Sequence, residues 1–294
     1  MASPTTESVI VRMPDRLFPY EFWQGGLAAL ATQYQANLPV PHIHLAPFLQ
    51  EDIVRQVALE FPGPNSHGWI QYRHYNENKL GKTDRTAFPS LTARVIDELN
   101  SREFIDWLSQ LTGIPGLLPD ASLEGGGLHQ TERGGFLNVH ADFTHHPHRQ
   151  NWRRRCNLLL YLNEGWKEEW GGAIEFWNRD MTACVAKFPP KLNHAVIFNT
   201  TEDAYHGYPD PITPPEGVTR KSLALYYYTP ETTTRTTRRS TNYRARPGDN
   251  FKAVFIWLDK QLLSIYSRVK TKLGLSDKFV SSVLGWLARR KNRS

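Results

Sequence analysis

The sequence contains two histidines and one aspartate whose spacing suits a metal site. His140-Ala141-Asp142 follows the apolar run Phe-Leu-Asn-Val, and His206 follows a second apolar run, Ala195-Val-Ile-Phe. In a β-strand, residues i and i+2 point to the same face, so His140 and Asp142 can bind one ion while Ala141 faces away. His206 must then come from another strand that folds back beside the first. Two histidines and one carboxylate form the ligand set that leaves a divalent iron with open coordination positions.

A second pair of polar residues repeats the same spacing later in the chain. Arg220-Lys221-Ser222 opens a long apolar segment, Leu-Ala-Leu-Tyr-Tyr-Tyr. Strand alternation places Arg220 and Ser222 on one face and Lys221 on the other. A guanidinium beside a hydroxyl is suited to hold a carboxylate through two hydrogen bonds. We therefore expect a carboxylate-binding clamp near the metal.

The His-x-Asp motif alone is weak. A chain with 11 histidines and 29 acidic residues should contain about one such motif by chance. The metal prediction rests on the ordered set, because each of its members follows or opens a β-like run.

The first third of the sequence has the spacing of helices. Residues 20–112 are expected to be mainly helical with extended segments between, and these helices should brace the outside of a later sheet. A helix is predicted over Ala46 to Phe61, where Pro62-Gly63-Pro64 stops it. Ser101 should cap the start of another helix that ends at Gly113.

From Gly125 the pattern changes to short strands separated by glycine, proline and asparagine. Seven or eight short antiparallel strands favour a double-sheet jelly roll, also called a double-stranded β-helix, with a metal at its mouth. The fold class is therefore mainly β with flanking helices. The strands are predicted at 135–143, 156–163, 172–178, 182–188, 194–199, 203–208 and 219–229.

The composition suggests one main domain followed by a different C-terminal region. Residues 1–230 are expected to form this domain, with a helical brace at about 20–115 and a jelly-roll core at about 125–230. Residues 231–294 should be a basic linker and amphipathic helices. Residues 231–249 have a linker composition, and a second short helix should begin at Ser276. The first helix carries a stripe of apolar residues at steps of three and four: Phe251, Val254, Phe255, Leu258, Leu262, Ile265, Tyr266 and Val269.

The basic charge of the chain is concentrated in this C-terminal region. Residues 231–294 contain 15 Lys+Arg and 4 Asp+Glu, a net charge of +11, whereas residues 1–230 have a net charge of −5. A basic block next to an apolar stripe is suited to an anionic membrane surface. A solvated charged face, or packing of the stripe on the main domain or on a second subunit, would give the same sequence pattern.

The compartment can also be predicted from composition. The N-terminus lacks the basic start and apolar run of a signal peptide, and no stretch reaches the roughly 20 apolar residues of a membrane-spanning helix. Two cysteines, Cys156 and Cys184, are too few for a disulfide framework. We therefore expect a cytoplasmic protein, with a peripheral location on the inner membrane face if the C-terminal helices bind lipid.

Taken together, these residues resemble the prolyl 4-hydroxylase-like branch of the Fe(II)- and 2-oxoglutarate-dependent oxygenases. The resemblance covers roughly residues 70 to 230 and is densest from 125 to 229. It rests on short motifs in a fixed order: Gly134-Gly-Phe-Leu-Asn-Val-His-Ala-Asp142, Tyr161-Leu-Asn163, Trp170-Gly-Gly172, Pro189-Pro190, Tyr205-His-Gly207 and Arg220-Lys-Ser222.

The resemblance assigns a role to each site residue. It implies that His140, Asp142 and His206 bind Fe(II), and that Arg220 pairs with the distal carboxylate of 2-oxoglutarate. Tyr161 would offer its hydroxyl to the same carboxylate, and Ser222 would add a hydrogen bond. The implied cofactors are Fe(II), 2-oxoglutarate and O2, with ascorbate as a further candidate. The implied reaction hydroxylates an aliphatic C–H bond with release of succinate and CO2.

The sequence departs from this branch at one position and leaves the role of three histidines open. Relatives often place a cosubstrate-contacting tyrosine shortly before the first ligand, but no tyrosine lies between Tyr75 and His140. His129 and Gln130 are the candidate replacements. The histidines that follow Asp142 suggest a polar surface loop or spare imidazoles beside the site: His145, His146 and His148.

Other functions remain open from sequence alone. The main alternative is a catalytically degenerate jelly roll that binds a carboxylate or glycan, and a cupin-type isomerase or hydrolase is a third candidate. The substrate could be a small molecule, a glycan or a protein side chain. The run Arg153-Arg154-Arg155 would favour an anionic substrate, or it could lie on the rim. Nucleic acid is the least favoured partner, because the basic charge lies outside the barrel strands. The oligomeric state is not predicted.

Overall fold

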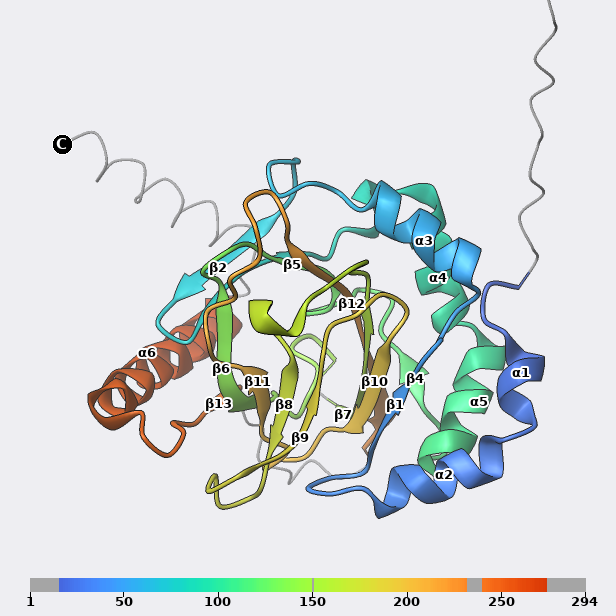
Figure 1. Ribbon diagram of the computed structural model, residues 1–294. Helices are drawn as coiled ribbons and strands as arrows, with labels where there is room; N and C mark the ends of the chain where they lie inside the picture. Colours follow the sequence, from blue (N-terminus) through green and yellow to red (C-terminus); the bar gives the residue numbers. More distant parts are fainter. Residues whose placement is uncertain (1–15, 150, 232–239, 274–294) are drawn as a thin grey trace, which may run out of the picture.

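The computed structural model describes residues 16–149, 151–231 and 240–273 (Figure 1). Within these residues, one antiparallel sheet of 13 strands curls into a nearly closed barrel. Its main path runs β1-β10-β7-β12-β5-β3-β6-β11-β8-β9, while β2 pairs with β3, β4 with β12 and β13 with β6. The strands are β1 (His42–Leu45), β2 (Ile70–His74), β3 (Glu77–Lys82), β4 (Leu118–Pro119), β5 (Gly127–Thr131), β6 (Phe136–Ala141), β7 (Trp152–Tyr161), β8 (Ile174–Trp177), β9 (Cys184–Phe188), β10 (Ala195–Asn199), β11 (His206–Tyr208), β12 (Arg220–Pro230) and β13 (Asn242–Tyr243).

The expected jelly roll is confirmed. All seven strands predicted after residue 135 are present as β6 to β12, most of them shorter than predicted. Chain neighbours are often not sheet neighbours, since β7 lies between β10 and β12. This crossing order brings β6 and β11 together, and these are the strands of the predicted metal ligands.

Part of the predicted helical brace belongs to the barrel instead. Strands β2 and β3 fall inside residues 20–115, and β3 lies between β5 and β6 in the sheet. The sequence of β3, Glu-Asn-Lys-Leu-Gly-Lys, is poor in β-branched and aromatic residues, which are enriched in strands. Pairing with two neighbouring strands therefore outweighs its weak local preference.

The brace consists of five short helices on one side of the barrel: α1 (Tyr20–Gln24), α2 (Leu27–Ala36), α3 (Glu51–Glu60), α4 (Ser90–Leu99) and α5 (Arg102–Thr112). The described residues also form two 3-10 turns, η1 (Arg85–Ala87) before α4 and η2 (Glu168–Trp170) between β7 and β8. The Ser101 cap is confirmed, because its hydroxyl accepts the Phe104 N–H at 3.2 Å. Gly113 ends α5 in the left-handed conformation, as predicted.

The predicted start of the helix at Ala46 is wrong. Helix α3 begins at Glu51. The N–H groups of Phe48 and Leu49 instead donate to the side-chain oxygen of Asn193 at 3.1 and 2.8 Å. A distant side chain therefore binds the backbone N–H groups of this segment, and residues 46–50 stay outside the helix.

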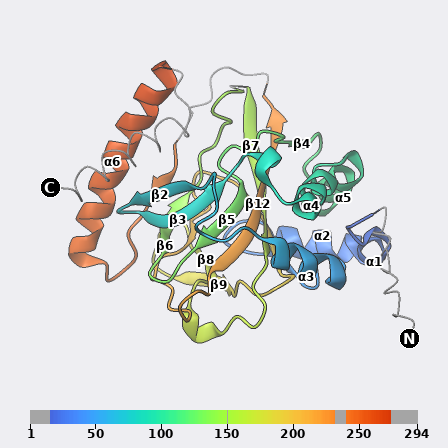
Figure 2. The same ribbon diagram turned by 90° about the horizontal axis from the view of Figure 1, so that it is seen from above.

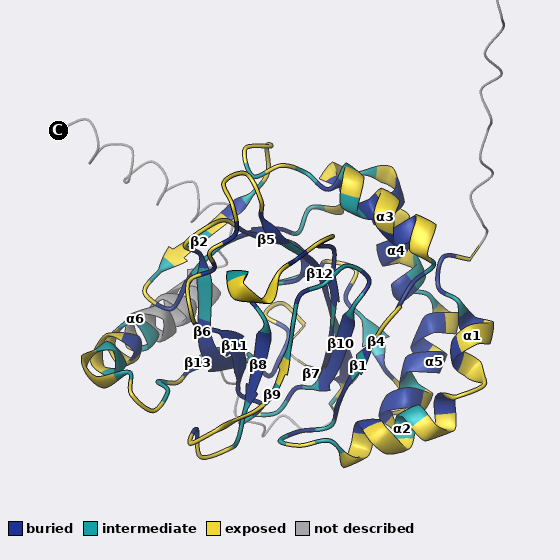
Figure 3. Ribbon diagram, viewed as in Figure 1, coloured by how far each residue is buried: buried dark blue, intermediate teal, exposed yellow. Residues whose placement is uncertain are grey.

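The main hydrophobic core lies between the brace and the sheet (Figure 3). Helix α5 buries Phe104, Leu108 and Leu111 completely, and Tyr227 of β12 meets them from the sheet. The Tyr227 hydroxyl donates to the Leu99 carbonyl at 2.9 Å. Because apolar burial is the main stabilising force in folding, this layer holds one wall of the barrel rigid.

The long helix α6 (Asn250–Leu273) lies on the opposite side of the barrel, next to β2 and β3 (Figures 1 and 2). Strand β13 precedes it and pairs with β6, so this part of the predicted linker is attached to the sheet. The helix predicted from Ser276 lies outside the described residues. None of the helices in the described part of the chain has the length and apolarity to span a bilayer.

Candidate metal centre

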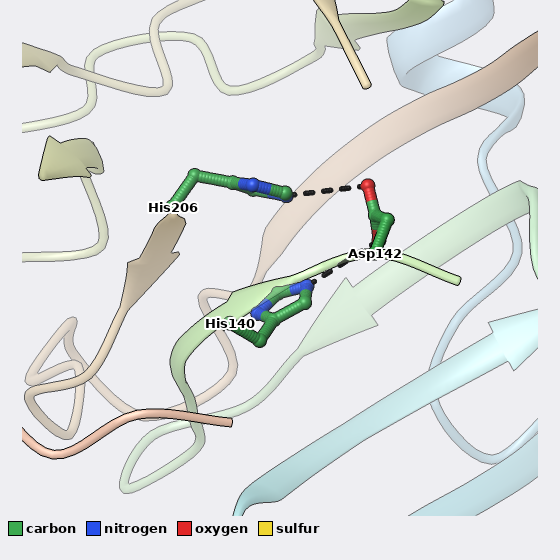
Figure 4. A group of neighbouring side chains, drawn as sticks. All are labelled: His140, Asp142 and His206. Carbon is green, nitrogen blue, oxygen red and sulfur yellow. Dashed lines mark ion pairs between the residues drawn. The ribbon is translucent and has the colours of Figure 1, made fainter. Parts of the chain in front are cut away.

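The three predicted metal ligands meet inside the barrel. Strand β6 ends at Ala141, so Asp142 follows it directly, and His206 at the start of β11 pairs with His140. The Nε2 atoms of His140 and His206 lie 3.5 and 3.6 Å from the two Asp142 carboxylate oxygens (Figure 4). One ligand atom from each residue falls within 4.8 Å of the others. Among the described residues, this is the one group of three or more such side chains close enough to hold a metal.

Backbone carbonyls fix the orientation of both imidazoles. The Nδ1 atom of His140 lies 2.9 Å from the Asn138 carbonyl, and that of His206 lies 2.8 Å from the Ala204 carbonyl. A carbonyl can only accept, so each Nδ1 must carry the proton. In the neutral ring, the lone pair is then on Nε2, which faces Asp142 and is available to a metal.

Asp142 is held as a carboxylate by two neighbours on β7. Its Oδ2 accepts from the Asn157 amide at 2.7 Å and pairs with Arg154 at 3.0 Å. Burial alone would raise the pKa of Asp142, but the charges of Arg154 and His206 hold it well below its ordinary value. The side chain is therefore ionised at neutral pH, as a metal ligand must be.

Arg154 is the most important site residue that the sequence did not single out. The run Arg153-Arg154-Arg155 was predicted either to favour an anionic substrate or to lie on the rim, yet Arg154 is 2% exposed. Its Nε donates to Asn157 at 2.7 Å, and its guanidinium lies 3.4 Å from the centre of the Tyr226 ring. The rim alternative is therefore wrong for Arg154, because Asp142, Asn157 and Tyr226 surround its guanidinium inside the barrel.

Aromatic rings surround the two histidines. Phe198 meets His206 edge-on at 4.7 Å between ring centres, and Tyr243 of β13 lies 5.5 Å from His140. Burial lowers the pKa of His206 to about 4. The rings limit access of water and keep the imidazole neutral, which is the form that binds a metal.

Arg220 lies where the carboxylate clamp was predicted. It is 4% exposed, its Nε donates to the Gly172 carbonyl at 2.7 Å, and its guanidinium lies 4.1 Å from the Tyr208 ring centre. Gly172 has φ of +77°, and a Cβ on it would lie 3.0 Å from the Arg220 side chain. The Trp-Gly-Gly motif therefore lets the chain pass directly over the guanidinium.

Strand alternation in β12 is as predicted. Ser222 is 3% exposed and is opposite Tyr161 of β7 in the sheet. Lys221 points the other way, where its ammonium lies 5.7 Å from the ring of Phe61 on the brace side. Arg220 and Ser222 therefore share the face of β12 that is turned away from the brace.

The hydroxyl of Tyr161 is placed to donate to a bound carboxylate. Its side chain is fully buried, no described residue accepts a hydrogen bond from the hydroxyl, and Arg220 lies 4.9 Å from the ring centre. A buried hydroxyl without a partner costs about 1–3 kcal/mol. A dicarboxylate bound at Arg220 would supply the missing acceptor, so the donors present fit 2-oxoglutarate.

Only one of the two candidates for the missing tyrosine faces the site. His129 is opposite Ser222 between β5 and β12, so their side chains share a face. Burial and the charge of Lys79 lower the pKa of His129 to about 3. Gln130 points the other way, and its amide donates to Thr219 at 2.8 Å.

An ion pair near the site was also missed. Glu77 and Lys79 of β3 lie 3.3 Å apart and are 11% and 14% exposed. Lys79 and Arg220 both contribute to the low pKa of His129, as positive charges nearby. The i, i+2 spacing of Glu77 and Lys79 was the available signal, but it is informative only once β3 is recognised as a strand.

The prediction of a polar surface loop is wrong for two of its three histidines. His145 pairs with Glu231 at 3.0 Å, and His146 pairs with Asp120 at 3.3 Å inside the protein. Burial raises the pKa of Asp120, but the hydrogen bonds from His146, Ser122 and the Glu124 N–H, with the charge of His146, together outweigh burial and lower the pKa to about 2. His148 is exposed as expected.

Comparison with known proteins agrees with this geometry. The model of the 2OG-Fe(II) oxygenase superfamily matches residues 126–228, which include the triad and the clamp. Among solved structures, a prolyl hydroxylase from Trichoplax adhaerens, bound to a hypoxia inducible factor peptide fragment, has a TM-score of 0.50 at 15% identity. The match covers 70% of this chain and 92% of that one. At this identity the likeness shows a shared fold.

Two further structures are similar at slightly lower scores. A prolyl 4-hydroxylase from Pseudomonas putida has 20% identity and a TM-score of 0.49, and the match covers 69% of this chain and 99% of that one. A prolyl 4-hydroxylase from Phytophthora capsici has 19% identity and a TM-score of 0.48, with 75% and 69% covered. No curated protein sequence matches the chain.

Proposed function

We propose that this protein is an oxygenase that hydroxylates an aliphatic C–H bond and releases succinate and CO2, because residues 126–228 match the model of the 2OG-Fe(II) oxygenase superfamily. One observation supports the proposal most strongly. A metal triad with its supporting hydrogen bonds and a buried guanidinium with an unpartnered hydroxyl lie in the same barrel. The first suits Fe(II), and the second suits the distal carboxylate of 2-oxoglutarate.

His140, Asp142 and His206 would hold the metal. The His–carbonyl contacts aim both Nε2 atoms at one point, and Arg154 with Asn157 keeps the Asp142 carboxylate in place. When bound, Fe(II) and 2-oxoglutarate together supply the activation of O2. The protein contributes orientation through side chains that are largely buried.

Arg220, Tyr161 and Ser222 would hold the cosubstrate. The planar guanidinium can donate two parallel hydrogen bonds, while Tyr161 donates a third. Gly172 and Tyr208 prevent the guanidinium from turning away. The clamp therefore sets how far the keto acid end reaches toward the triad.

The geometry favours catalysis over the main alternative. A degenerate binding protein has no need for a carboxylate ligand held by a buried arginine and two imidazoles held by carbonyls. A cupin-type isomerase or hydrolase has no need for a buried clamp built from Arg220 and Tyr161. Neither alternative explains why the metal triad and the carboxylate clamp occur together in one barrel.

The substrate is proposed only as a class. One structural neighbour is a prolyl hydroxylase with a bound peptide fragment. A protein side chain is therefore the first candidate, followed by a small molecule and a glycan. We place the enzyme in the cytoplasm, where a ferrous centre stays reduced.

The test uses purified protein with Fe(II), 2-oxoglutarate and fractions of a cell extract. We expect succinate to form faster when a fraction contains the substrate, and a component of that fraction to gain the mass of one oxygen atom. His206→Ala is the matched control. If the parent protein binds 2-oxoglutarate but forms no more succinate than this variant with any fraction, the degenerate binding protein is the better description.

A further inference from the structure

Over residues 250–261, helix α6 docks on the barrel through the face that carries Ile256 and Asp259. Ile256 on this face is 2% exposed, and Asp259 accepts from the Asn76 amide at 2.6 Å. Asp259 also lies 2.8 Å from His74 of β2. The three residues Ile256, Asp259 and Asn76 therefore fix the rotation of the helix about its axis.

The opposite face of α6 is apolar and exposed. Phe251 is 86% exposed, Val254 54%, Phe255 52% and Leu258 44%, and Trp257 beside them is 56% exposed. These five residues are called the α6 stripe. At about 100° per residue, the stripe is centred roughly 160° from Ile256 around the helix. Four of its members, Phe251, Val254, Phe255 and Leu258, begin the apolar spacing found in the sequence, so over residues 251–258 the periodic face is not the face that packs.

The α6 stripe differs from the other exposed apolar residues. These are scattered over separate elements, such as Phe22 on α1 and Leu59 on α3, and single exposed residues are normal. The stripe gathers five large side chains within eight positions, and Tyr75 of the neighbouring hairpin lies 5.4 Å from Phe255. A contiguous patch of this kind marks an interaction surface.

The charge around the stripe indicates the kind of partner. Helix α6 contains five Lys and Arg residues and one acidic residue, and residues 231–294 together have a net charge of +11. A second copy of the same surface would place like charges together, which costs binding energy. Nucleic acid would match the charge but not the exposed valine, leucine and phenylalanine side chains.

We propose that the α6 stripe binds the surface of an anionic lipid bilayer. Phenylalanine, tryptophan and leucine on one face of a basic helix suit the boundary between headgroups and acyl chains. Basic residues near the surface add attraction, about fivefold in affinity for each charge. Because α6 is anchored through Asp259, binding would hold the barrel in one orientation at the membrane.

The test measures co-sedimentation of the full-length protein with vesicles. We expect binding to phosphatidylcholine mixed with phosphatidylserine, no binding to phosphatidylcholine alone, and release as salt screens the charges. The double variant Phe251→Ser, Leu258→Ser should bind at least about tenfold more weakly, because two large apolar side chains no longer enter the lipid. Truncation after Pro230 is unsuitable, since it also removes β13 from the site.

The matched control is Phe22→Ser, Leu59→Ser, which changes the same residue types on the brace helices. This variant should bind vesicles like the parent, and both double variants should keep 2-oxoglutarate turnover. Equal loss of binding in both variants, or no vesicle binding by the parent, overturns the proposal. If the parent is a dimer that Phe251→Ser, Leu258→Ser converts to a monomer, and it ignores vesicles, the stripe is a subunit interface.

Discussion

The two ends of the candidate site differ in whether the groups that would contact a ligand already have partners within the protein. At the metal end, each imidazole Nδ1 has a carbonyl partner, and Asp142 has Asn157 and Arg154. At the clamp end, the hydroxyl of Tyr161 is buried without a partner. The triad is therefore built to keep its shape without a ligand, whereas the clamp is completed by one.

The two ends therefore differ in when their hydrogen bonds form: before ligand binding at the metal end, and on ligand binding at the clamp end. Hydrogen bonds at the metal end orient ligands in advance, so binding need not reorganise them. An unpartnered group at the clamp end destabilises the free protein and regains its hydrogen bond when a carboxylate arrives. Substitutions at the metal end should therefore lower the affinity for Fe(II), and substitutions at the clamp end should raise the KM for 2-oxoglutarate.

The largest expected effect comes from removing a metal ligand. His206→Ala leaves two protein ligands where this kind of centre requires three. We expect loss of tight Fe(II) binding and of all turnover, measured by metal content and by 2-oxoglutarate consumption. The same result is expected for His140→Ala and Asp142→Ala. Full 2-oxoglutarate consumption by His206→Ala would refute the assignment of the metal end.

Arg220→Ala should have the next largest effect, and only at the clamp end. Fe(II) binding should stay intact, while the KM for 2-oxoglutarate should rise roughly 10- to 100-fold because a charge-assisted pair is lost. Arg220→Lys should recover little, since lysine lacks the planar fork. If Arg220→Ala has the parent's KM, another cation such as Lys79 is the clamp, because Lys221 faces Phe61.

Arg154→Met should act through the metal end. Asp142 would lose its charged partner, and affinity for Fe(II) should fall roughly 10- to 100-fold. The free energy of unfolding of the apo protein should fall as well, because an unpaired buried carboxylate remains. Arg153→Met is the matched control and should change neither quantity. A raised KM for 2-oxoglutarate with unchanged Fe(II) affinity would instead place Arg154 at the clamp end.

The smallest effect is expected for Tyr161→Phe. Loss of one hydrogen bond should raise the KM for 2-oxoglutarate about 2- to 10-fold and leave Fe(II) binding unchanged. The apo protein should be no less stable than the parent in thermal unfolding, because the buried hydroxyl without a partner is removed. A less stable apo protein with an unchanged KM would show that the hydroxyl has a structural role.

The sequence allowed prediction of the parts whose signal is local. His140 and Asp142 share a strand face because of their i, i+2 spacing, and Arg220 and Ser222 do so for the same reason. The Ser101 cap and the Gly113 stop each depend on one residue type at one position. The strands β6 to β12 have apolar runs between turn residues, so their positions were also predicted.

The missed parts depend on contacts between distant segments. Nothing in Arg153-Arg154-Arg155 distinguishes the buried arginine, because its burial depends on Asp142 and Tyr226 closing around it. His146 is buried because Asp120, which lies before the first predicted strand, supplies its partner. Strand β3 has a polar sequence and is held by β5 and β6. Spacing along the chain contains no information on these partners.

The pairing of β13 with β6 has a consequence for solubility. Strand β3 covers β6 only along Phe136 and Leu137, and β13 continues the coverage along His140 and Ala141. A fragment that ends at Pro230 would leave these backbone groups as an open edge beside His140. Open edges recruit strands from other molecules. Such a fragment should aggregate through the strand that carries the first metal ligand, so the C-terminal region protects the barrel from self-association.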